Sequence, residues 1–297
     1  MNQFAIAVLC CLAISPPSQA ANYRFSKIHV PNSDSTEANG INARGHIVGS
    51  YVDSEGISHG FLLRNGVFKT IDVPGASVTL AARSINARGD IVGGFLDSDF
   101  ARHGYLLSDG KFTQIDYPGS TGTYTSGINN AGDITGGYFK KNGTNGTFIR
   151  KNGKFYNVHI PDSSAPNVRS AQDNGRVLVG SALMDFDGGF HGFVRRKPGE
   201  FELIDLPSRS VPCGGVRSIN QRGDMVGAFA YLDSIEECYR PDHDRHGFLL
   251  RDGYFKVINY PGSLVTDAFS INDDRVIVGQ YIDKQGNSHG FKAVPKK

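Results

Sequence analysis

The chain consists largely of one pattern written several times. INARGHIVGSY, beginning at Ile41, returns in varied form at Ile85, Ile128, Ala171, Ile219 and Ile271. HGFLL at His59 and FKTIDVP at Phe68 recur in step with it. The period is about 44 residues, a length typical of solenoids, propellers and other repeat arrays. Each copy is too small to bury an apolar face alone, so copies must stack to make a core.

Each copy predicts four short strands. The first ends at Ser-Ile-Asn, the second is Ile-Val-Gly-x-Tyr, the third His-Gly-Phe-Leu-Leu and the fourth Phe-x-x-Ile-Asp. Asn65-Gly66 and its equivalents at 109–110, 152–153 and 252–253 separate the third strand from the fourth, and this dipeptide is the strongest short signal for a β-hairpin. No sustained helical period follows residue 20. Four strands in about 44 residues match one blade of a β-propeller.

The fourth strand indicates how the array closes. Five copies lie inside the chain, but the last repeat stops near Val294 without one. The missing copy stands at the other end, as Phe25–His29. We therefore expect an all-β fold, a six-bladed β-propeller with four strands per blade, in which the N-terminal strand closes the C-terminal blade. Closure removes an edge that would invite aggregation; an open superhelical array is the alternative.

Residues 1–20 predict a secretory signal peptide. An apolar run from Phe4 to Ile14 is followed by Ser18-Gln19-Ala20, with small residues at the first and third places before a cut. The run is too short to span a bilayer, and no other segment is long enough. We expect residues 21–297 to form one propeller domain that is secreted, to the periplasm or the extracellular space.

Cysteine usage fits this compartment. Cys10 and Cys11 leave with the leader, so the mature chain keeps Cys213 and Cys238. Two cysteines in an oxidising compartment most simply form a disulfide.

The rhythm of His-Gly-Phe-Leu and Asn-x-x-Gly-x-Ile-Val-Gly resembles the HAF repeat of extracellular bacterial proteins, over nearly the whole mature chain. This chain has Gly where the family's tripeptide has Ala, and it lacks the Trp that commonly follows. The resemblance implies secretion and a β-repeat architecture. It implies no catalytic residues.

Charge excludes one class of partner. Lys and Arg number 31 and Asp and Glu 29, so the formal net charge is +2, and no strong field favours nucleic acid. Trp is absent, so stacking on a sugar would depend on Tyr and Phe.

The repeated histidines have a structural interpretation. With Asn65-Gly66 as a two-residue turn, His59 lies opposite Asp72 across the hairpin. Opposed polar pairs stabilise a sheet modestly and fix its register. Metal binding and catalysis are the alternatives, and the two copies without a carboxylate argue against a repeated catalytic dyad. The other expected pairs are His103 with Asp116, His191 with Asp205, His246 with Asn259, His159 with Gly146, and His289 with His29.

Two other repeated residues also predict structural roles. Gly49 and its equivalents are expected to permit close approach of strands or blades. Asn42 and its equivalents Asn86, Asn129, Asn220 and Asn272 are expected to close the turn after the first strand through their side chains.

Variation concentrates on one face of the expected ring. The loops between second and third strands and the connections between blades share that face, and variable loops on a repeated scaffold are the usual place for binding. Cys213 and Cys238 both fall there, so their disulfide would pin the long insertion before His246. The candidate ligand-binding residues are Glu236, Glu237, Tyr239, Arg240, Asp242, His243 and Asp244 in that insertion, and Asp185 and Asp187 in an earlier loop.

These observations favour a secreted binding or interaction module that contacts a glycan or protein through the variable face, as a monomer and without a cofactor. An extracellular polysaccharide lyase or hydrolase is the alternative, with Asp185, Asp187, Asp242 or His243 as acid and base. A purely structural envelope protein is a third hypothesis. For the insertion, a solvated loop and a divalent-metal site also remain open, although its spacing matches no specific metal motif.

Overall fold

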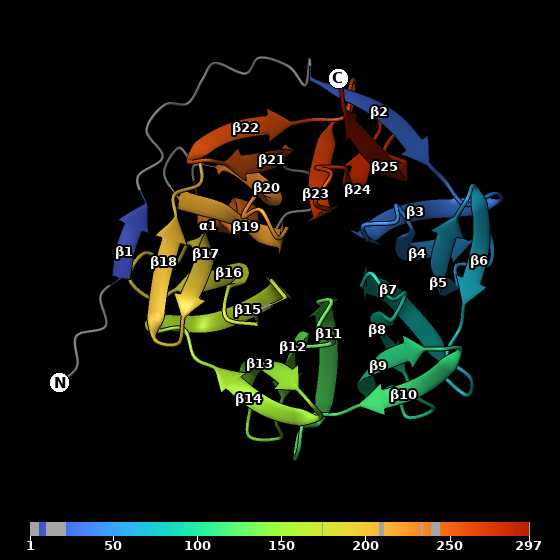
Figure 1. The fold of residues 1–297 in the computed structure, drawn as a ribbon, viewed down its shortest axis with the longest axis horizontal. Coiled ribbons are helices and arrows are strands. Elements are labelled where there is room, and N and C mark those ends of the chain that lie inside the picture. Colours follow the sequence, from blue (N-terminus) through green and yellow to red (C-terminus); the bar gives the residue numbers. More distant parts are fainter. Residues whose placement is uncertain are drawn as a thin grey trace.

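The computed structural model describes residues 6–9, 22–173, 175–207, 211–232, 234–238 and 244–296. Over these residues the chain forms an all-β, propeller-like fold, with its sheets arranged around a central axis (Figure 1). The expected propeller architecture is confirmed at this level. No helix within the described ranges is long and apolar enough to cross a membrane.

Four sheets have four antiparallel strands each. In three of them the strands follow one another along the chain: β3 (Ser33–Ile41), β4 (Ile47–Asp53), β5 (Ser58–Arg64) and β6 (Val67–Ile71); β7 (Val78–Ile85), β8 (Ile91–Leu96), β9 (Arg102–Ser108) and β10 (Lys111–Ile115); β11 (Gly122–Ile128), β12 (Ile134–Phe139), β13 (Asn145–Lys151) and β14 (Lys154–Val158). The fourth sheet contains β23 (Val265–Ile271), β24 (Ile277–Ile282), β25 (Ser288–Pro295) and β2 (Tyr23–Ile28).

The other described strands form one nine-stranded sheet. It contains two consecutive antiparallel runs: β15 (Ser163–Ala171), β16 (Leu178–Met184), β17 (Phe190–Lys197) and β18 (Glu200–Ile204); then β19 (Val211–Ile219), β20 (Met225–Leu232), β21 (Arg245–Arg251) and β22 (Tyr254–Ile258). A parallel pair, Phe190 with Cys213, joins the two runs. The ninth strand, β1 (Ile6–Leu9), belongs to the expected leader and lies parallel to β18. The expected cleavage after Ala20 lies outside the described residues.

The two ends of the chain meet in one sheet. β2 pairs antiparallel with β25, from Tyr23 opposite Pro295 to Ile28 opposite Gly290, so that the ring closes in Figure 1 where the blue and dark red strands lie side by side. The N-terminal strand therefore completes the C-terminal sheet, as its sequence predicted.

The tight hairpins expected from the sequence are present. Asn65 and Gly66 have φ angles of 52° and 79°, and a type I′ turn requires positive φ at both central residues. The turn fixes the register of β5 and β6, with Gly60 opposite Ile71.

The core between the sheets uses the same positions in each repeat. The third strand contributes a fully buried ring, and the glycine of the second strand makes room for it. At Gly49 a Cβ atom would overlap the carbonyl oxygen of Glu37 and the ring of Phe61, which confirms the close approach expected there. The rings with no exposed surface are Phe61, Tyr105, Phe148, Phe193, Phe248 and Phe291.

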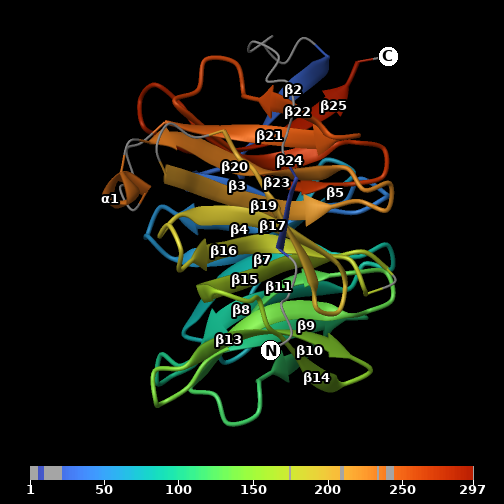
Figure 2. The ribbon, with the colours of Figure 1, turned by 90° about the vertical axis from the view of Figure 1, so that its left-hand side faces the viewer.

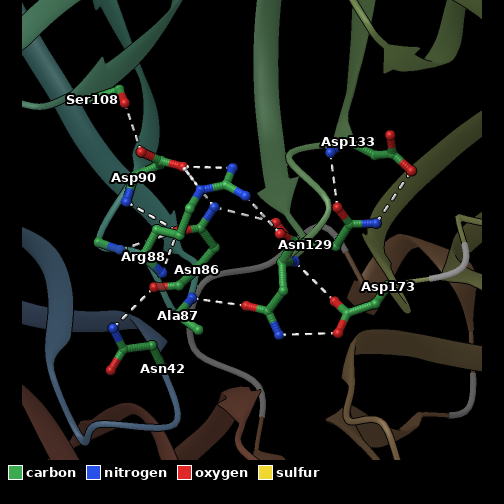
Figure 3. A network of polar contacts seen from close by, with 11 residues as sticks. Asn42, Asn86, Ala87, Arg88, Asp90, Ser108, Asn129, Asp133 and Asp173 are labelled. Carbon is green, nitrogen blue, oxygen red and sulfur yellow. Dashed lines mark hydrogen bonds and ion pairs between the residues drawn. The ribbon is translucent and has the colours of Figure 1, made fainter.

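Asparagine side chains close the first turns and also join neighbouring repeats. Oδ1 of Asn42 accepts hydrogen bonds from the backbone of Arg44 and His46, each at 3.0 Å, as expected. Its Nδ2 donates to the carbonyl oxygen of Asn86, 3.0 Å away in the next repeat. Figure 3 shows how this contact continues from Asn86 to Asn129.

These contacts form a closed circle, which we call the amide ring. Gln172 takes the asparagine's place in the fourth repeat, and Asn272 in the last repeat donates to the carbonyl oxygen of Asn42 at 3.1 Å. The amide ring consists of Asn42, Asn86, Asn129, Gln172, Asn220 and Asn272.

Candidate binding site at the loop face

The two faces of the ring carry different kinds of connection between strands. The turns that carry the amide ring and the tight hairpins lie at one end, which we call the turn face. The loops between second and third strands and the connections between sheets lie at the other end, the loop face. A short helix, α1 (Ile235–Cys238), projects from the ring at the loop face (Figure 2).

The histidine at the start of β5 lies between two carboxylates. Nδ1 of His59 is 2.8 Å from Oδ1 of Asp72, the cross-strand partner that the register predicts. Its Nε2 is 3.2 Å from Oδ2 of Asp53, at the end of β4. Only a protonated imidazole donates from both nitrogens, so the arrangement favours the charged form.

His103 repeats this geometry. Its Nδ1 is 2.8 Å from Asp116 and its Nε2 is 2.9 Å from Asp97. Asp97 also accepts backbone hydrogen bonds from Asp99 and Ala101 within its own loop. Nε2 of His289 likewise lies 2.9 Å from Asp283. The carboxylates Asp53, Asp97 and Asp283 were not predicted as partners, because they stand where the second strand meets the variable loop.

The remaining pairs differ among repeats. Nδ2 of Asn259 lies 2.8 Å from Nδ1 of His246, and Nδ1 of His289 lies 3.4 Å from Nδ1 of His29, both as the register predicts. Nε2 of His191 contacts Asp187 at 2.9 Å, as Nε2 of His59 contacts Asp53. The predicted pairing of His191 with Asp205 is wrong, because no hydrogen bond joins these two described residues.

Burial and carboxylates act in opposite directions on these histidines. Burial lowers the pKa of His59, but the hydrogen bonds and charges of Asp72 and Asp53 outweigh it, and the pKa is raised. The pKa of Asp53 is lowered, first by its hydrogen bond from the backbone of Ile57 and also by His59. Mutual stabilisation of this kind is what a structural ion pair produces.

Several predicted ligand-binding residues have other contacts. Asp187 accepts from the backbone of Gly189 and contacts His191, and Asp244 lies 3.4 Å from His246. Asp185 and Glu236 are exposed. The backbone N–H of Asp185 donates to the carbonyl oxygen of Asp162, and hydrogen bonds from its own backbone and from Ser234 lower the pKa of Glu236. Glu237 lies in α1. The candidates Tyr239, Arg240, Asp242 and His243 lie outside the described residues.

The predicted disulfide between Cys213 and Cys238 is present and attaches α1 to β19. Beside it lies a cavity of about 350 Å³, lined by residues of the strands from β15 to β24, which we call the loop-face cavity. This volume is at the lower end of what holds a small organic ligand. Its lining includes both cysteines, Arg169, Arg217, Arg245 and Phe269.

A β-bulge recurs at one position in the strands nearest the axis. In β7 the pairing with β8 skips Arg83, between Ala82 and Ser84. The extra residue of a bulge is left out of the ladder, which re-aims its side chain. The bulge residues, in chain order, are Asn39, Arg83, Ser126, Arg169, Arg217 and Phe269.

The arginines among them share one electrostatic environment. Burial lowers the pKa of Arg169, and the positive charges of Arg217 and Arg83 lower it further. Burial likewise lowers the pKa of Arg217, and the negative charge of Asp267 partly opposes this effect. The guanidinium of Arg217 lies 5.6 Å from the ring of Phe269. Sequence reasoning missed these positions, because it followed the residues that repeat and the bulge residue differs from copy to copy.

The acidic residues near the bulge arginines have other partners. Asp267 is buried and accepts two hydrogen bonds from Arg245, at 3.1 and 2.9 Å. Glu37 accepts one from Ser50 at 3.3 Å. Arg83, Arg169 and Arg217 have no ion-pair partner among the described residues.

Two loop tips add exposed aromatic surface. Phe100 is 70% exposed and has a φ of 59°, a conformation that bulky residues rarely adopt. Phe186, in the loop with Asp187, is 62% exposed.

At the turn face, a polar hollow of about 90 Å³ lies inside the amide ring. No group of three or more potential ligands among His, Cys, Asp and Glu is arranged to hold a metal ion within the described part of the chain.

The sequence matches no known family profile and no curated protein. The structure is similar to a putative TolB from Agrobacterium tumefaciens, with a TM-score of 0.57 and 12% identity over 93% of this chain and 98% of that one. It is similar to the lectin of Aleuria aurantia (TM-score 0.54, 12% identity, 90% of this chain and 93% of that one). It is also similar to a gluconolactonase from Xanthomonas campestris (TM-score 0.53, 14% identity, 92% of this chain and 90% of that one). At these identities the likeness concerns the fold alone.

Proposed function

We propose that this protein is a secreted six-bladed β-propeller that binds an extracellular ligand in the loop-face cavity. The observation that carries the proposal is the cavity itself. It is lined by three arginines and an aromatic ring from strands between β15 and β24, and the disulfide that attaches α1 borders it. Concave sites with a few convergent polar groups are the usual form of a small-molecule site.

The six-bladed form rests on three observations. Four sheets already have four strands each, and the nine-stranded sheet contains two further runs of four. The amide ring has six members and returns to its start. β2 supplies the strand that the last repeat lacks.

Secretion is supported by the leader-like residues 1–20 and by the disulfide, since disulfides persist in oxidising compartments. The same leader and the His-Gly-Phe repeats support a relationship to the HAF-repeat proteins. The similar lectin structure makes a glycan the first ligand class to test.

The test is a thermal-shift screen of residues 21–297 against neutral and acidic oligosaccharides. A ligand at about 100 times its Kd stabilises a protein by roughly 2.7 kcal/mol, which is a shift of several degrees. We expect Phe269→Ala, in the cavity wall, to weaken binding. Tyr254→Ala is the matched control, because Tyr254 is a 68% exposed ring at the start of β22.

Any ligand found should then be incubated with the protein and checked for products. An unchanged ligand supports a binding module, and turnover would support the glycan-cleaving alternative. Equal binding by wild type and Phe269→Ala would place the ligand elsewhere and contradict the proposed site.

A further inference from the structure

The loop-face cavity has an excess of positive charge. Its lining holds three arginines, Arg169, Arg217 and Arg245, and one acidic residue, Asp267. Asp267 is already neutralised by Arg245. Holding Arg83, Arg169 and Arg217 near one another costs free energy, because like charges in a partly desolvated site repel.

Donor atoms in this region also lack partners. Nε of Arg169 and Nε of Arg102 are buried and make no hydrogen bond within the described structure. Arg102, at the start of β9, lies over the ring of Tyr124, 5.5 Å away, and its pKa is lowered by burial and by Arg83. A buried charged donor without a partner is costly, so an anion from outside is what these groups lack.

Two other buried polar side-chain atoms, an amide oxygen and a hydroxyl, also lack hydrogen-bond partners. Oδ1 of Asn167 and Oγ of Ser126 are buried without a hydrogen bond. Asn167 stands two residues before Arg169 on β15 and pairs with Ser181, which lines the cavity. A carboxylate cannot donate to Oδ1 of Asn167, but a hydroxyl group can. The missing ligand therefore combines an anion with hydroxyl donors.

Building on the proposed function, we propose that the bulge arginines of β15 and β19, Arg169 and Arg217, receive the carboxylate of an acidic saccharide, a uronate sugar. One of its hydroxyls bonds to Asn167, the register partner of the lining residue Ser181. Arginine matches a carboxylate because its planar fork can donate two parallel hydrogen bonds. The ring of Phe269, beside Arg217, offers an apolar surface to one side of a pyranose. The strands that carry the bulges are otherwise repeated, so the bulge residue is what determines the class of ligand that binds.

The test is calorimetric titration of residues 21–297 with digalacturonate, with cellobiose as its neutral counterpart. We expect digalacturonate to bind and cellobiose to bind more weakly. Arg169→Gln and Arg217→Gln should each weaken digalacturonate binding by about 10- to 100-fold, the range for a hydrogen bond to a charged group. Arg196→Gln is the control, since Arg196 is an exposed residue of β17 paired with Glu202.

Melting of the ligand-free protein gives a second readout. If the arginines are held for a ligand, Arg169→Gln relieves repulsion and raises the Tm while it removes binding, as expected for a binding site that is costly in the free protein. A lowered Tm together with unchanged binding would show a purely structural arginine and overturn the proposal.

Other probes distinguish the proposal of an acidic saccharide from the broader proposal of a binding module. Cellobiose binding could be weakened by Phe269→Ala and left unchanged by Arg169→Gln. This result would support the binding module and would overturn the proposal of an acidic ligand. Inorganic phosphate or tetraglutamate binding as tightly as digalacturonate would overturn the saccharide class. No binding of any probe by a folded wild type would contradict both.

Discussion

In five repeats a single asparagine side chain holds its own turn and also contacts the neighbouring repeat. Oδ1 of Asn86 accepts from the backbone of Arg88, Gly89 and Asp90, while Nδ2 donates to the carbonyl oxygen of Asn129 (Figure 3). The residue is only 2% exposed. Its removal leaves several buried groups without partners, and such losses exceed the net value of the bonds themselves.

We therefore expect Asn86→Ala to lower the free energy of unfolding by about 2–3 kcal/mol. Asn142→Ala is the control, because Asn142 is exposed and holds one loop hydrogen bond from Thr144. Its effect should stay within about 0.5 kcal/mol. Urea denaturation measures both, and equal losses would show that the amide ring has no special role.

The histidine between Asp53 and Asp72 predicts a pH dependence. The pKa of His59 is raised on folding, so its contribution to stability is complete below the unfolded pKa, about 6.5. The contribution is lost as pH rises through the folded pKa. His59→Asn should thus destabilise the protein more at pH 5.5 than at pH 8.5. An equal or larger effect at pH 8.5, measured by urea denaturation, would mean that the charged form is not the one stabilised.

At this scale, sequence reasoning succeeded where partners lie on one hairpin. His59 and Asp72 are joined by a turn whose type is readable from Asn65-Gly66. It missed Asp53, which reaches His59 from a loop, and the contact from Asn42 to Asn86, which crosses between repeats. Such contacts depend on how copies stack, which no single copy encodes.

Among the elements, the insertion that carries α1 is attached to the ring by the Cys213–Cys238 disulfide across 25 residues of sequence. A loop of this length implies about 3.5 kcal/mol of stabilisation in the chain-entropy account. Cys213→Ser with Cys238→Ser should lower the free energy of unfolding by up to this amount, measured by urea denaturation. The reduced wild type should behave like the double variant, and a variant as stable as the oxidised wild type would contradict the role.

The bulges are the elements that sequence reasoning could not place. Asn39, Arg83 and their equivalents look like ordinary strand residues, and a bulge adds one residue without a composition signal of its own. The arginines were visible, but their convergence on one cavity requires the closed ring. The candidate site was therefore expected in the insertion, whereas the structure adds three arginines that line the loop-face cavity, Arg169, Arg217 and Arg245.

For the whole molecule, β2 determines whether the ring is closed. Deleting residues 21–31 leaves β25 with a free edge, which invites pairing with other chains. We expect a lower Tm and self-association, measured by differential scanning calorimetry and light scattering. A monomer with unchanged Tm would mean that closure contributes nothing.

A rearranged chain provides the control for that deletion. Tyr23 lies opposite Pro295, so an Asn-Gly turn after Pro295 followed by residues 23–31 rebuilds the hairpin found in the other repeats. This variant should recover the Tm and remain monomeric. Failure to recover would show that the deletion acted through something other than the missing strand.

The ligand has one predicted location, the loop-face cavity beside the Cys213–Cys238 disulfide. A crystal structure of residues 21–297 grown with digalacturonate measures this directly. We predict electron density for one uronate ring against Phe269, with its carboxylate on Arg169 and Arg217. Density at the turn face or on the loop tips, with the cavity empty, would contradict the account.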